Sequence, residues 1–546
     1  MTRFVFQSAA LLCFSLIGLA HVPAAAQVAP DAGRVLQEEL KQLPTPPRTS
    51  KGLDMQPTQS APAQPGGPQV VVGSITFSGN TVFGSDELLR VLGKVQDQSF
   101  DLVGLRSLSD KITQHYQQAS YPFARAFIAP QQLVNGGALQ IQVVEGRYGR
   151  VSADGNPGLT QKAQSYLSGL QSGSLIESSA LERTTLLLDD LPGIKITPVI
   201  RPGTALGTGD LDIVVDYDKR YQGEVGLDNH GNYYSGQWRT RANLDINSPF
   251  ALGDQISLRA LYTQSHLWLG SANYSIPLGG QGLRANIGYA QTVYSLDNGF
   301  EGNEGVARIS GAGLGYALLR SQRSNINLSV SWQHKRLYNS YFFGASTERY
   351  HSTTLPVTLG FDHKDSFGGG GVTYGAVTWT QGHLHKDDVV RQGSFSKYNL
   401  DLVRLQAVTG NVSLFVRFSG QWANKNLDSS ESMSLGGASA VRAYPSGEAS
   451  GDQGWLTQLE LRYRLGDFSP YAFYDYGYMK INARPSQVTS PAPDETRAGA
   501  GVGVRYQAHG LSMDAAIAWR TRGGEPSSDT HADPKPRFWL TMAYAF

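Results

Sequence analysis

The sequence predicts a transmembrane β-barrel of about sixteen antiparallel strands, preceded by two small α/β domains and an N-terminal helix. The last ten residues place Phe538, Leu540, Met542 and Tyr544 on one strand face, with small or polar residues between them. This length suits a tilted strand that crosses a bilayer. Alternation of the same kind recurs from residue 221 onward, and two modules of similar pattern come before it. These three features favour a barrel with accessory domains.

Composition and the N-terminus indicate export. The chain has 546 residues and a net charge of +1, so no charge excess points to nucleic acid as a partner. Residues 1–26 read as a cleavable signal peptide, with Arg3 before an apolar stretch and Ala24–Ala26 at its end. The single cysteine, Cys13, lies inside that signal, so disulfides and thiolate chemistry are not expected. The rest of the chain contains no run of 18 apolar residues, so no membrane-spanning helix is expected.

A short helix and a linker are expected next. Within residues 27–43, Asp31 can cap a helix that carries Leu36, Leu40 and Leu43 at helical spacing and ends before Pro44. Such a helix lies either on a surface or docked inside another element. Residues 44–69 are rich in Pro, Gly and Gln and predict a linker. About 26 residues of extended linker reach roughly 80 Å.

Two modules of the same order follow. Residues 70–145 predict a strand, a helix over 85–92, a longer helix containing Leu105 and Ile112, and two strands. Residues 146–220 repeat this order of strand, two helices and two strands. Repeated modules favour a binding array over an active site.

The barrel would occupy residues 221–546, although the periodicity alone also allows fourteen strands. Some connections look short, which suits periplasmic turns, and others look long, which suits outer loops. The short ones are 277–281, 409–410, 466–468 and 509–510, and the long ones are 336–351, 425–454, 479–494 and 522–535. The N-terminal and C-terminal ends of the barrel domain would then both lie on the periplasmic side.

Two motifs of the barrel half combine charge with glycine and aromatic residues. Residues 441–448 lie in the longest loop, 425–454, and residues 473–477 lie on a strand. Alternation turns Asp475 into the lumen, where a carboxylate is costly unless it is paired or hydrated. Arg442 could pair with it through two hydrogen bonds. From the residues alone, that pair and an unpaired, hydrated Asp475 both remain open.

At these motifs the chain resembles transporters of two-partner secretion, of the haemolysin secretion/activation type, within the superfamily of outer-membrane assembly factors. The stretch from Phe77 to Thr81 resembles the start of a POTRA domain, and residues 188–193 and 207–211 resemble a second one. Residues 226–229 resemble the first barrel strand of the family. The motif positions are Phe77, Gly79 and Asn80 in the first POTRA domain, Val441, Arg442, Tyr444, Gly447 and Glu448 at the loop tip, and Phe473, Asp475 and Gly477 on the barrel wall.

The resemblance implies an architecture and a pairing. Residues 70–145 and 146–220 would be POTRA domains, and the N-terminal helix with Leu36, Leu40 and Leu43 would plug the barrel. Loop 425–454 would fold back into the pore, where Arg442 meets Asp475. The family usually has glycine after the arginine, whereas this chain has Ala443. If the tip needs a positive φ there, alanine would be strained.

The resemblance also implies a function. The chain would secrete, without ATP, a large partner exoprotein from the periplasm to the exterior. That partner would carry an N-terminal β-helical secretion domain and be a haemolysin, an adhesin or a contact-dependent toxin. The barrel would lie in outer-membrane lipid and the POTRA domains in the periplasm. The alternative is an assembly factor that inserts other barrels, and a passive porin or receptor fits the two modules less well.

The sequence offers little for an enzyme. Gly368–Gly371 lacks the Lys-Ser/Thr of a phosphate loop, and no G-x-S-x-G nucleophile elbow occurs. His383 and His385 share a strand face without a third ligand at metal spacing. We therefore expect no catalytic residue, cofactor or metal.

Overall fold

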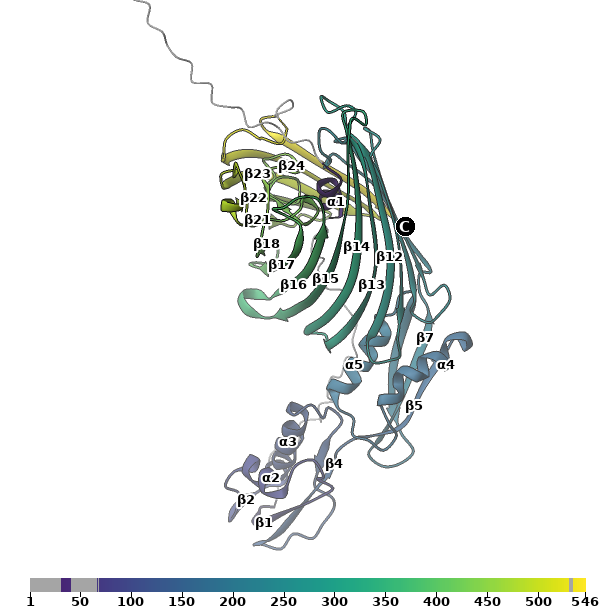
Figure 1. Ribbon diagram of the computed structural model, residues 1–546. Helices are drawn as coiled ribbons and strands as arrows, with labels where there is room; N and C mark the ends of the chain where they lie inside the picture. Colours follow the sequence, from purple (N-terminus) through teal and green to yellow (C-terminus); the bar gives the residue numbers. More distant parts are fainter. Residues whose placement is uncertain (1–30, 41–65, 67, 530–533) are drawn as a thin grey trace, which may run out of the picture.

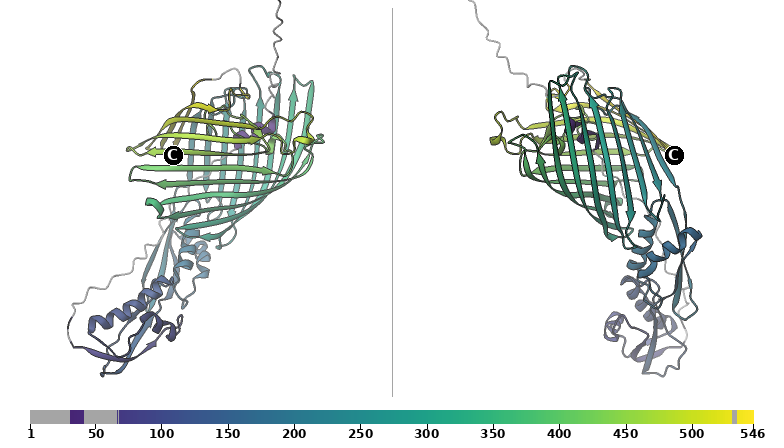
Figure 2. Two further views of the ribbon diagram at one scale, coloured as in Figure 1. Left: turned by 90° about the vertical axis from the view of Figure 1, so that its left-hand side faces the viewer. Right: turned by 45° about the vertical axis from the view of Figure 1, so that its right-hand side comes forward.

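The computed structural model describes residues 31–40, 66, 68–529 and 534–546. The expected signal peptide and most of the expected linker lie outside these residues. A barrel forms one end of the molecule, and two α/β domains extend from its opposite rim in succession (Figure 1). The first domain lies farthest from the barrel in every view (Figures 1 and 2).

Sixteen antiparallel strands of the described residues close into the barrel, in sequence order around the wall. The last strand pairs with the first, Met542 opposite Leu227. The predicted strand number and fold class are therefore confirmed. The strands are β8 (Tyr221–Asp228), β9 (Arg239–Asn247), β10 (Gln255–Thr263), β11 (Trp268–Pro277), β12 (Leu283–Ser295), β13 (Glu304–Arg320), β14 (Ser324–Tyr341), β15 (Ser346–Asp365), β16 (Gly371–His385), β17 (Gly393–Ala407), β18 (Val412–Ala423), β21 (Gln453–Tyr463), β22 (Phe468–Lys480), β23 (Glu495–Ala508), β24 (Leu511–Arg522) and β25 (Arg537–Ala545).

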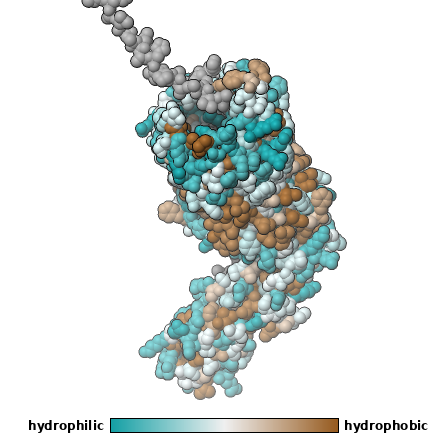
Figure 3. Space-filling view, viewed as in Figure 1, coloured by the Kyte–Doolittle hydropathy of each residue, from teal (hydrophilic) through white to brown (hydrophobic). Residues whose placement is uncertain are grey.

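The two faces of the wall differ as alternation predicts. On β22, Phe473 and Asp475 are buried toward the lumen, whereas Tyr474 on the outer face is 42% exposed. Apolar side chains gather in a band over the lower part of the barrel wall, and hydrophilic residues prevail at the upper rim (Figure 3). A lipid-facing band of this kind explains a chain whose mean hydropathy is only −0.27.

The prediction of a long outer loop at residues 336–351 is wrong. Residues 336–351 are mostly strand, because β14 continues to Tyr341 and β15 begins at Ser346. The connection is a tight turn in which Phe342 and Phe343 have positive φ. The outward face here carries Arg and His instead of apolar residues, so the alternation that marks a membrane strand is missing.

In the first α/β domain, two helices pack on a four-stranded sheet. Strand order is β2-β1-β4-β3, with β1 and β4 parallel. A buried core that includes Leu88, Ile112 and Ile141 joins helices and sheet within this domain. Its elements are β1 (Val70–Ser78), α2 (Ser85–Leu92), β2 (Gln98–Phe100), α3 (Leu102–Gln118), β3 (Arg125–Phe127) and β4 (Gly137–Val144). The short strand β2 is the one element of this domain that the sequence did not predict.

The second α/β domain has a three-stranded sheet in the order β5-β7-β6. Its elements are β5 (Arg147–Gly155), α4 (Pro157–Tyr166), η1 (Leu167–Gly169), α5 (Ser178–Asp189), β6 (Ile194–Pro202) and β7 (Thr208–Tyr217). Its core includes Leu252, which belongs to the turn between β9 and β10 of the barrel. The second domain and the barrel therefore share one hydrophobic cluster.

Polar contacts reinforce that junction. Arg320 at the end of β13 holds the Asp190 carboxylate with hydrogen bonds of 2.6 and 2.8 Å. Leu191 packs so closely on Gly253 that a Cβ there would lie 2.6 Å from its side chain. The segment 188–193, singled out from the sequence, thus fastens the second domain to the barrel.

Helix α1 (Ala32–Leu40) lies within the barrel, against the lumenal side of the wall (Figures 1 and 2). It contacts β12, β13, β14 and the loop helix η3 (Ser429–Glu431). The predicted cap is confirmed, since the Asp31 carboxylate accepts a hydrogen bond of 2.9 Å from the Arg34 backbone N–H. Among the described residues, no helix has the length and apolar character needed to cross a membrane.

Candidate functional site

The loop 425–454, between β18 and β21, fills part of the lumen. Most of its residues are buried, among them Leu435, Val441 and Tyr444, none of which exposes any side-chain surface. It folds on itself through the short pair β19 (Met433–Ser434) and β20 (Ser450–Gly451). A connection that is buried to this extent has partners on the barrel wall.

Arg442 and Asp475 form the central contact between loop and wall. The guanidinium donates from Nε and Nη2 to the two carboxylate oxygens at 2.9 and 2.7 Å. The Arg442 backbone N–H adds a third hydrogen bond to Asp475, of 3.0 Å. Asp475 is fully buried and Arg442 is 4% exposed. The planar fork of arginine matches a carboxylate in this way, so side chain and backbone fix the loop tip together.

A second carboxylate, which the sequence interpretation missed, completes the site. Glu460 on β21 accepts a hydrogen bond of 2.6 Å from Arg442 Nη1. Arg505 and Arg462 also donate to Glu460, at 3.0 and 2.8 Å. Lumenal alternation places Glu460 on the same face as Arg462 on its strand, which was the available signal.

Aromatic rings enclose the arginine. Its guanidinium carbon lies 3.6 Å from the centroid of the Phe473 ring, a cation–π distance. The indole N–H of Trp539 donates to the Arg442 carbonyl at 2.7 Å. Phe473, the first residue of the wall motif, therefore covers the arginine face that carries no hydrogen bonds.

Two glycines of the wall leave room for the loop. A Cβ on Gly477 would lie 2.8 Å from the Leu435 side chain, and one on Gly499 would lie 2.4 Å from the Cβ of Ala443. Ala443 has no positive φ, so the strain considered for it is absent. The methyl group of Ala443 instead occupies the space that Gly499 leaves open.

The other tip residues hold neighbouring parts of the barrel. The Tyr444 hydroxyl donates to the carbonyl of Arg522 at 2.8 Å. Glu448 is fully buried and receives 2.8 Å hydrogen bonds from Arg497 and from the Ser528 backbone. Gly447 has φ +81°, a conformation that glycine adopts without strain.

A further charged anchor holds the start of the loop and was not expected. Glu431 of η3 accepts from Lys335 on β14 at 2.6 Å and from Lys397 on β17 at 2.9 Å. All three side chains are buried. The partners are separated by up to 96 residues in the sequence, and only the barrel register brings them together.

Helix α1 occupies lumenal space beside the loop. Leu36 and Val35 are 1% exposed and join a cluster with Tyr294, Leu337 and other lumenal side chains of the wall. The Ala32 N–H donates to Asn339 at 2.9 Å, and the Asp31 carboxylate accepts from the Ser429 hydroxyl at 2.7 Å. Arg34 donates to the carbonyl of Gly447. Of the other expected plug residues, Leu40 ends the helix and Leu43 lies outside the described residues.

The motif of the first domain shapes its sheet. Phe77 packs on the domain core, Gly79 has φ +82° close to the Val143 carbonyl, and Asn80 donates to the Phe83 carbonyl at 2.9 Å. Glu145 ends the same domain and accepts from the Val82 N–H at 2.7 Å. Burial raises the pKa of Glu145, but hydrogen bonds from Thr81, Val82 and Tyr116 outweigh burial and hold this pKa below its usual range. These contacts are structural.

The described residues contain no group of three or more His, Cys, Asp or Glu side chains that could hold a metal ion. The charged groups of the lumen are instead paired with one another across the loop and the wall. These pairs join the loop to the lumenal side of the barrel wall.

Two protein-family models match the chain. The family model described as haemolysin secretion/activation protein ShlB/FhaC/HecB matches residues 207–506. A model of the ShlB-type POTRA domain matches residues 70–146.

Curated relatives span nearly the same length. The heme/hemopexin transporter protein HuxB of Haemophilus influenzae is 26% identical, over 85% of this chain and 84% of its own. The hemolysin transporter protein ShlB of Serratia marcescens is 25% identical, over 90% of each chain. Among solved structures, CdiB from Escherichia coli aligns with a TM-score of 0.71 at 23% identity, covering 91% of this chain and 94% of its own. BamA from Haemophilus ducreyi aligns with a TM-score of 0.51 at 13% identity, over 88% of this chain and 100% of its own. These structures share the fold.

Proposed function

The chain belongs to the ShlB/FhaC/HecB family of haemolysin secretion/activation proteins, and from this premise we propose how it secretes its partner. It is an outer-membrane transporter of two-partner secretion, with its POTRA region in the periplasm. The observation that carries the proposal is a closed barrel whose lumen holds its own helix and loop, joined to two domains with sheet edges. Relatives named as transporters accord with our assignment of no enzymatic step to this chain.

We assign residues 70–145 and 146–220 to POTRA domains that capture an unfolded partner at a sheet edge. Three of the four sheet edges of these two domains are blocked or interrupted. The Gln164 amide side chain bonds the Ala153 N–H and the Val151 carbonyl on β5, and β6 contains Pro198. On β3, the Thr113 hydroxyl accepts from the Ala126 N–H. Strand β2, with exposed Gln98 and Ser99, is the least covered edge and is assigned first contact with the partner.

Crosslinking tests the capture step. A photoactivatable side chain at Ser99 on β2 should crosslink to the partner exoprotein during export, whereas one at Ser107, exposed on α3, should not. The partner is assigned an N-terminal β-helical secretion domain, so its strands would extend the sheet. Equal crosslinking at both positions contradicts capture at β2.

Deletion tests the role of both domains. Co-expression with the proposed partner, a large exoprotein with an N-terminal β-helical secretion domain, should release that exoprotein into the medium. Deletion of residues 70–220 should abolish the release and leave the barrel inserted in outer-membrane lipid. Normal release by the deletion variant refutes the capture role.

Passage through the barrel is assigned to withdrawal of α1. The Ala32 N–H donates to the Asn339 side chain at 2.9 Å, so these positions are neighbours at which a disulfide would fasten the helix to β14. The oxidised double variant, Ala32→Cys with Asn339→Cys, should stop release, and a reductant should restore it. Each single variant is the control. Undiminished release by the oxidised variant contradicts withdrawal of the helix.

A further inference from the structure

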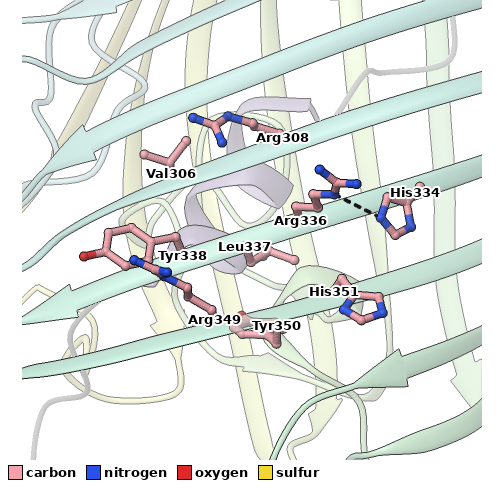
Figure 4. A pocket seen from close by; sticks show the side chains of 9 residues that line it. All are labelled: Val306, Arg308, His334, Arg336, Leu337, Tyr338, Arg349, Tyr350 and His351. Atoms are coloured by element: carbon pink, nitrogen blue, oxygen red, sulfur yellow. Dashed lines mark hydrogen bonds between the residues drawn. The ribbon is translucent and has the colours of Figure 1, made fainter.

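A cluster of basic side chains lies on the outer wall of the barrel, away from the lumenal site. We define the basic patch as Arg308, His334, Arg336, Arg349 and His351, from β13, β14 and β15. Arg308 stands directly opposite Arg336, and Arg336 directly opposite His351. The row continues to His385 on β16, whose ring stacks on His351 with centroids 4.3 Å apart. Figure 4 shows the five side chains of the patch on neighbouring strands, with α1 visible behind the wall.

Alternation establishes which way the patch faces. The neighbours of the patch in sequence, Ala307, Lys335 and Tyr350, are buried toward the lumen. Residues of the patch have the opposite parity on each strand and therefore face outward. Trp332, two residues nearer the periplasmic end of β14 than His334, is 48% exposed on the same outer face.

The height of the patch matches the outer leaflet. His334 is ten residues from Ser324, where β14 leaves the periplasmic turn. At about 3.3 Å per residue and a tilt of roughly 40°, this distance is about 25 Å along the membrane normal, the height of the apolar band of such barrels. The row nearer the periplasm, Val330, Val357 and Trp379, is apolar. The patch thus begins where acyl chains end and headgroups start.

The three arginines lack an acidic partner. Within the described part of the chain, no carboxylate forms a salt bridge with Arg308, Arg336 or Arg349. Their contacts are neutral or aromatic: Gln291 for Arg308 at 3.1 Å, His334 for Arg336 at 3.3 Å, and the Tyr338 ring for Arg349. Like charges directly opposite each other destabilise a sheet. An anion that bridges Arg308 and Arg336 would remove this repulsion.

The surface between these side chains is hollowed. A cavity of about 670 Å³ is lined by the whole patch together with Val306 and Tyr338, and by Leu337 and Tyr350 between them. A second cavity, of about 510 Å³, shares Arg308, His334 and Arg336 and adds Tyr289 and Ser310. Cavities of this size accommodate a sugar with its phosphate.

We propose that the basic patch binds the phosphorylated sugar headgroup of an outer-leaflet lipid, of the kind that lipopolysaccharide carries. Arginine holds phosphate through paired, charge-assisted hydrogen bonds. Trp332 and Tyr289 provide the aromatic side chains that lie at headgroup level in membrane proteins. The acyl chains of the same lipid would lie along the apolar row below. This site is independent of secretion and of the lumenal charges.

Lipid binding to the full chain in detergent tests the proposal. Native mass spectrometry should show bound lipid A that carries its phosphates, and markedly less of the dephosphorylated lipid. The triple variant Arg308→Gln, Arg336→Gln and Arg349→Gln should raise the Kd for phosphorylated lipid A by about tenfold or more. The control is Arg404→Gln, which removes an outward arginine near the opposite rim that is already paired with Asp365. It should leave the Kd unchanged.

A folding readout and two competitors keep the test decisive. The heat-dependent shift in gel mobility of a folded barrel should be the same for wild type and both variants. Equal affinity for phosphorylated and dephosphorylated lipid would overturn the proposal, as would an unchanged Kd in the folded triple variant. Saturable binding of inorganic phosphate without binding of lipid A would assign the patch to a free anion. Zinc binding that survives the arginine substitutions and excludes the lipid would assign it to a metal.

Discussion

The lumen holds two inserted elements, and their contacts differ in kind. Loop 425–454 meets the wall through buried charges: Arg442 with Asp475, Glu448 with Arg497 and Glu431 with lysines. Helix α1 and its cap carry two charged side chains, Asp31 and Arg34, but the groups that they and the helix backbone meet are neutral: the Asn339 amide, the Ser429 hydroxyl and the Gly447 carbonyl. A neutral group that loses its partner is readily hydrated in a wet lumen, whereas a buried charge is not. The contacts therefore favour a helix that leaves and a loop that stays.

Removal of the arginine gives the largest expected effect. Arg442→Ala leaves Asp475 buried without a counter-charge and should lower the free energy of unfolding by about 3–5 kcal/mol. Thermal unfolding in detergent measures this change, and release of the partner should fall in parallel. Arg404→Ala, on the exposed outer face, should cost about 1 kcal/mol or less. Equal costs for both variants would show that burial adds nothing to the contact between Arg442 and Asp475.

Exchange of the two charges sharpens the same comparison. In a simple pair, Arg442→Asp with Asp475→Arg would restore part of the lost stability. Here the carboxylate introduced at position 442 would face Glu460, which accepts from Arg442 at 2.6 Å in the native chain. We expect the exchange alone to recover little and to recover about 1–3 kcal/mol more when Glu460→Gln is added. Full recovery without that third change would show that Glu460 does not belong to the site.

Packing of the loop tip gives an intermediate effect. Gly499→Ala would bring two methyl carbons to 2.4 Å and should destabilise the barrel by about 1–3 kcal/mol. Adding Ala443→Gly removes the clash and should restore most of the loss. Thermal unfolding of the two single variants and the double variant measures the coupling. Additive effects would mean that the loop tip does not rest on the wall.

Displacing the helix should change stability least and conductance most. A side chain at Gly33 would lie 2.4 Å from the Ser429 hydroxyl, so Gly33→Leu should eject α1 from the loop. The melting temperature should change by a few degrees at most, while channel conductance in planar bilayers rises. Gly410→Leu, at a turn where a Cβ meets no atom within 4 Å, is the matched control. A closed channel in the Gly33 variant would place the seal in the loop alone.

The sequence predicts those parts of the molecule whose residues follow a periodic pattern along the chain. Strand alternation predicted the barrel and turned Asp475 inward, and helical spacing with Asp31 predicted α1. The loop motif and the wall motif were paired through a family resemblance, because 33 residues separate Arg442 from Asp475. The triad of Glu431, Lys335 and Lys397 has no local signal, since the register of distant strands assembles it.

The wrong prediction of a loop at residues 336–351 and the basic patch have the same physical cause. Strands that rise above the apolar band no longer face lipid tails, so Arg336 and His351 replace apolar residues on the outer face. The period of two survives on the lumenal face, where Leu337, Asn339 and Tyr350 are buried. The alternation on the lumenal face alone therefore predicts the full lengths of β14 and β15.

The shared core at Leu252 and the grip of Arg320 on Asp190 have a mechanical consequence. These contacts fasten the second α/β domain to the barrel mouth, so any hinge would lie farther out. The first domain meets the second through contacts of its own, such as the 2.9 Å hydrogen bond from the Ser178 N–H to the Ser120 carbonyl. In the proposed capture step, the first domain would deliver the incoming chain to an inlet of fixed orientation.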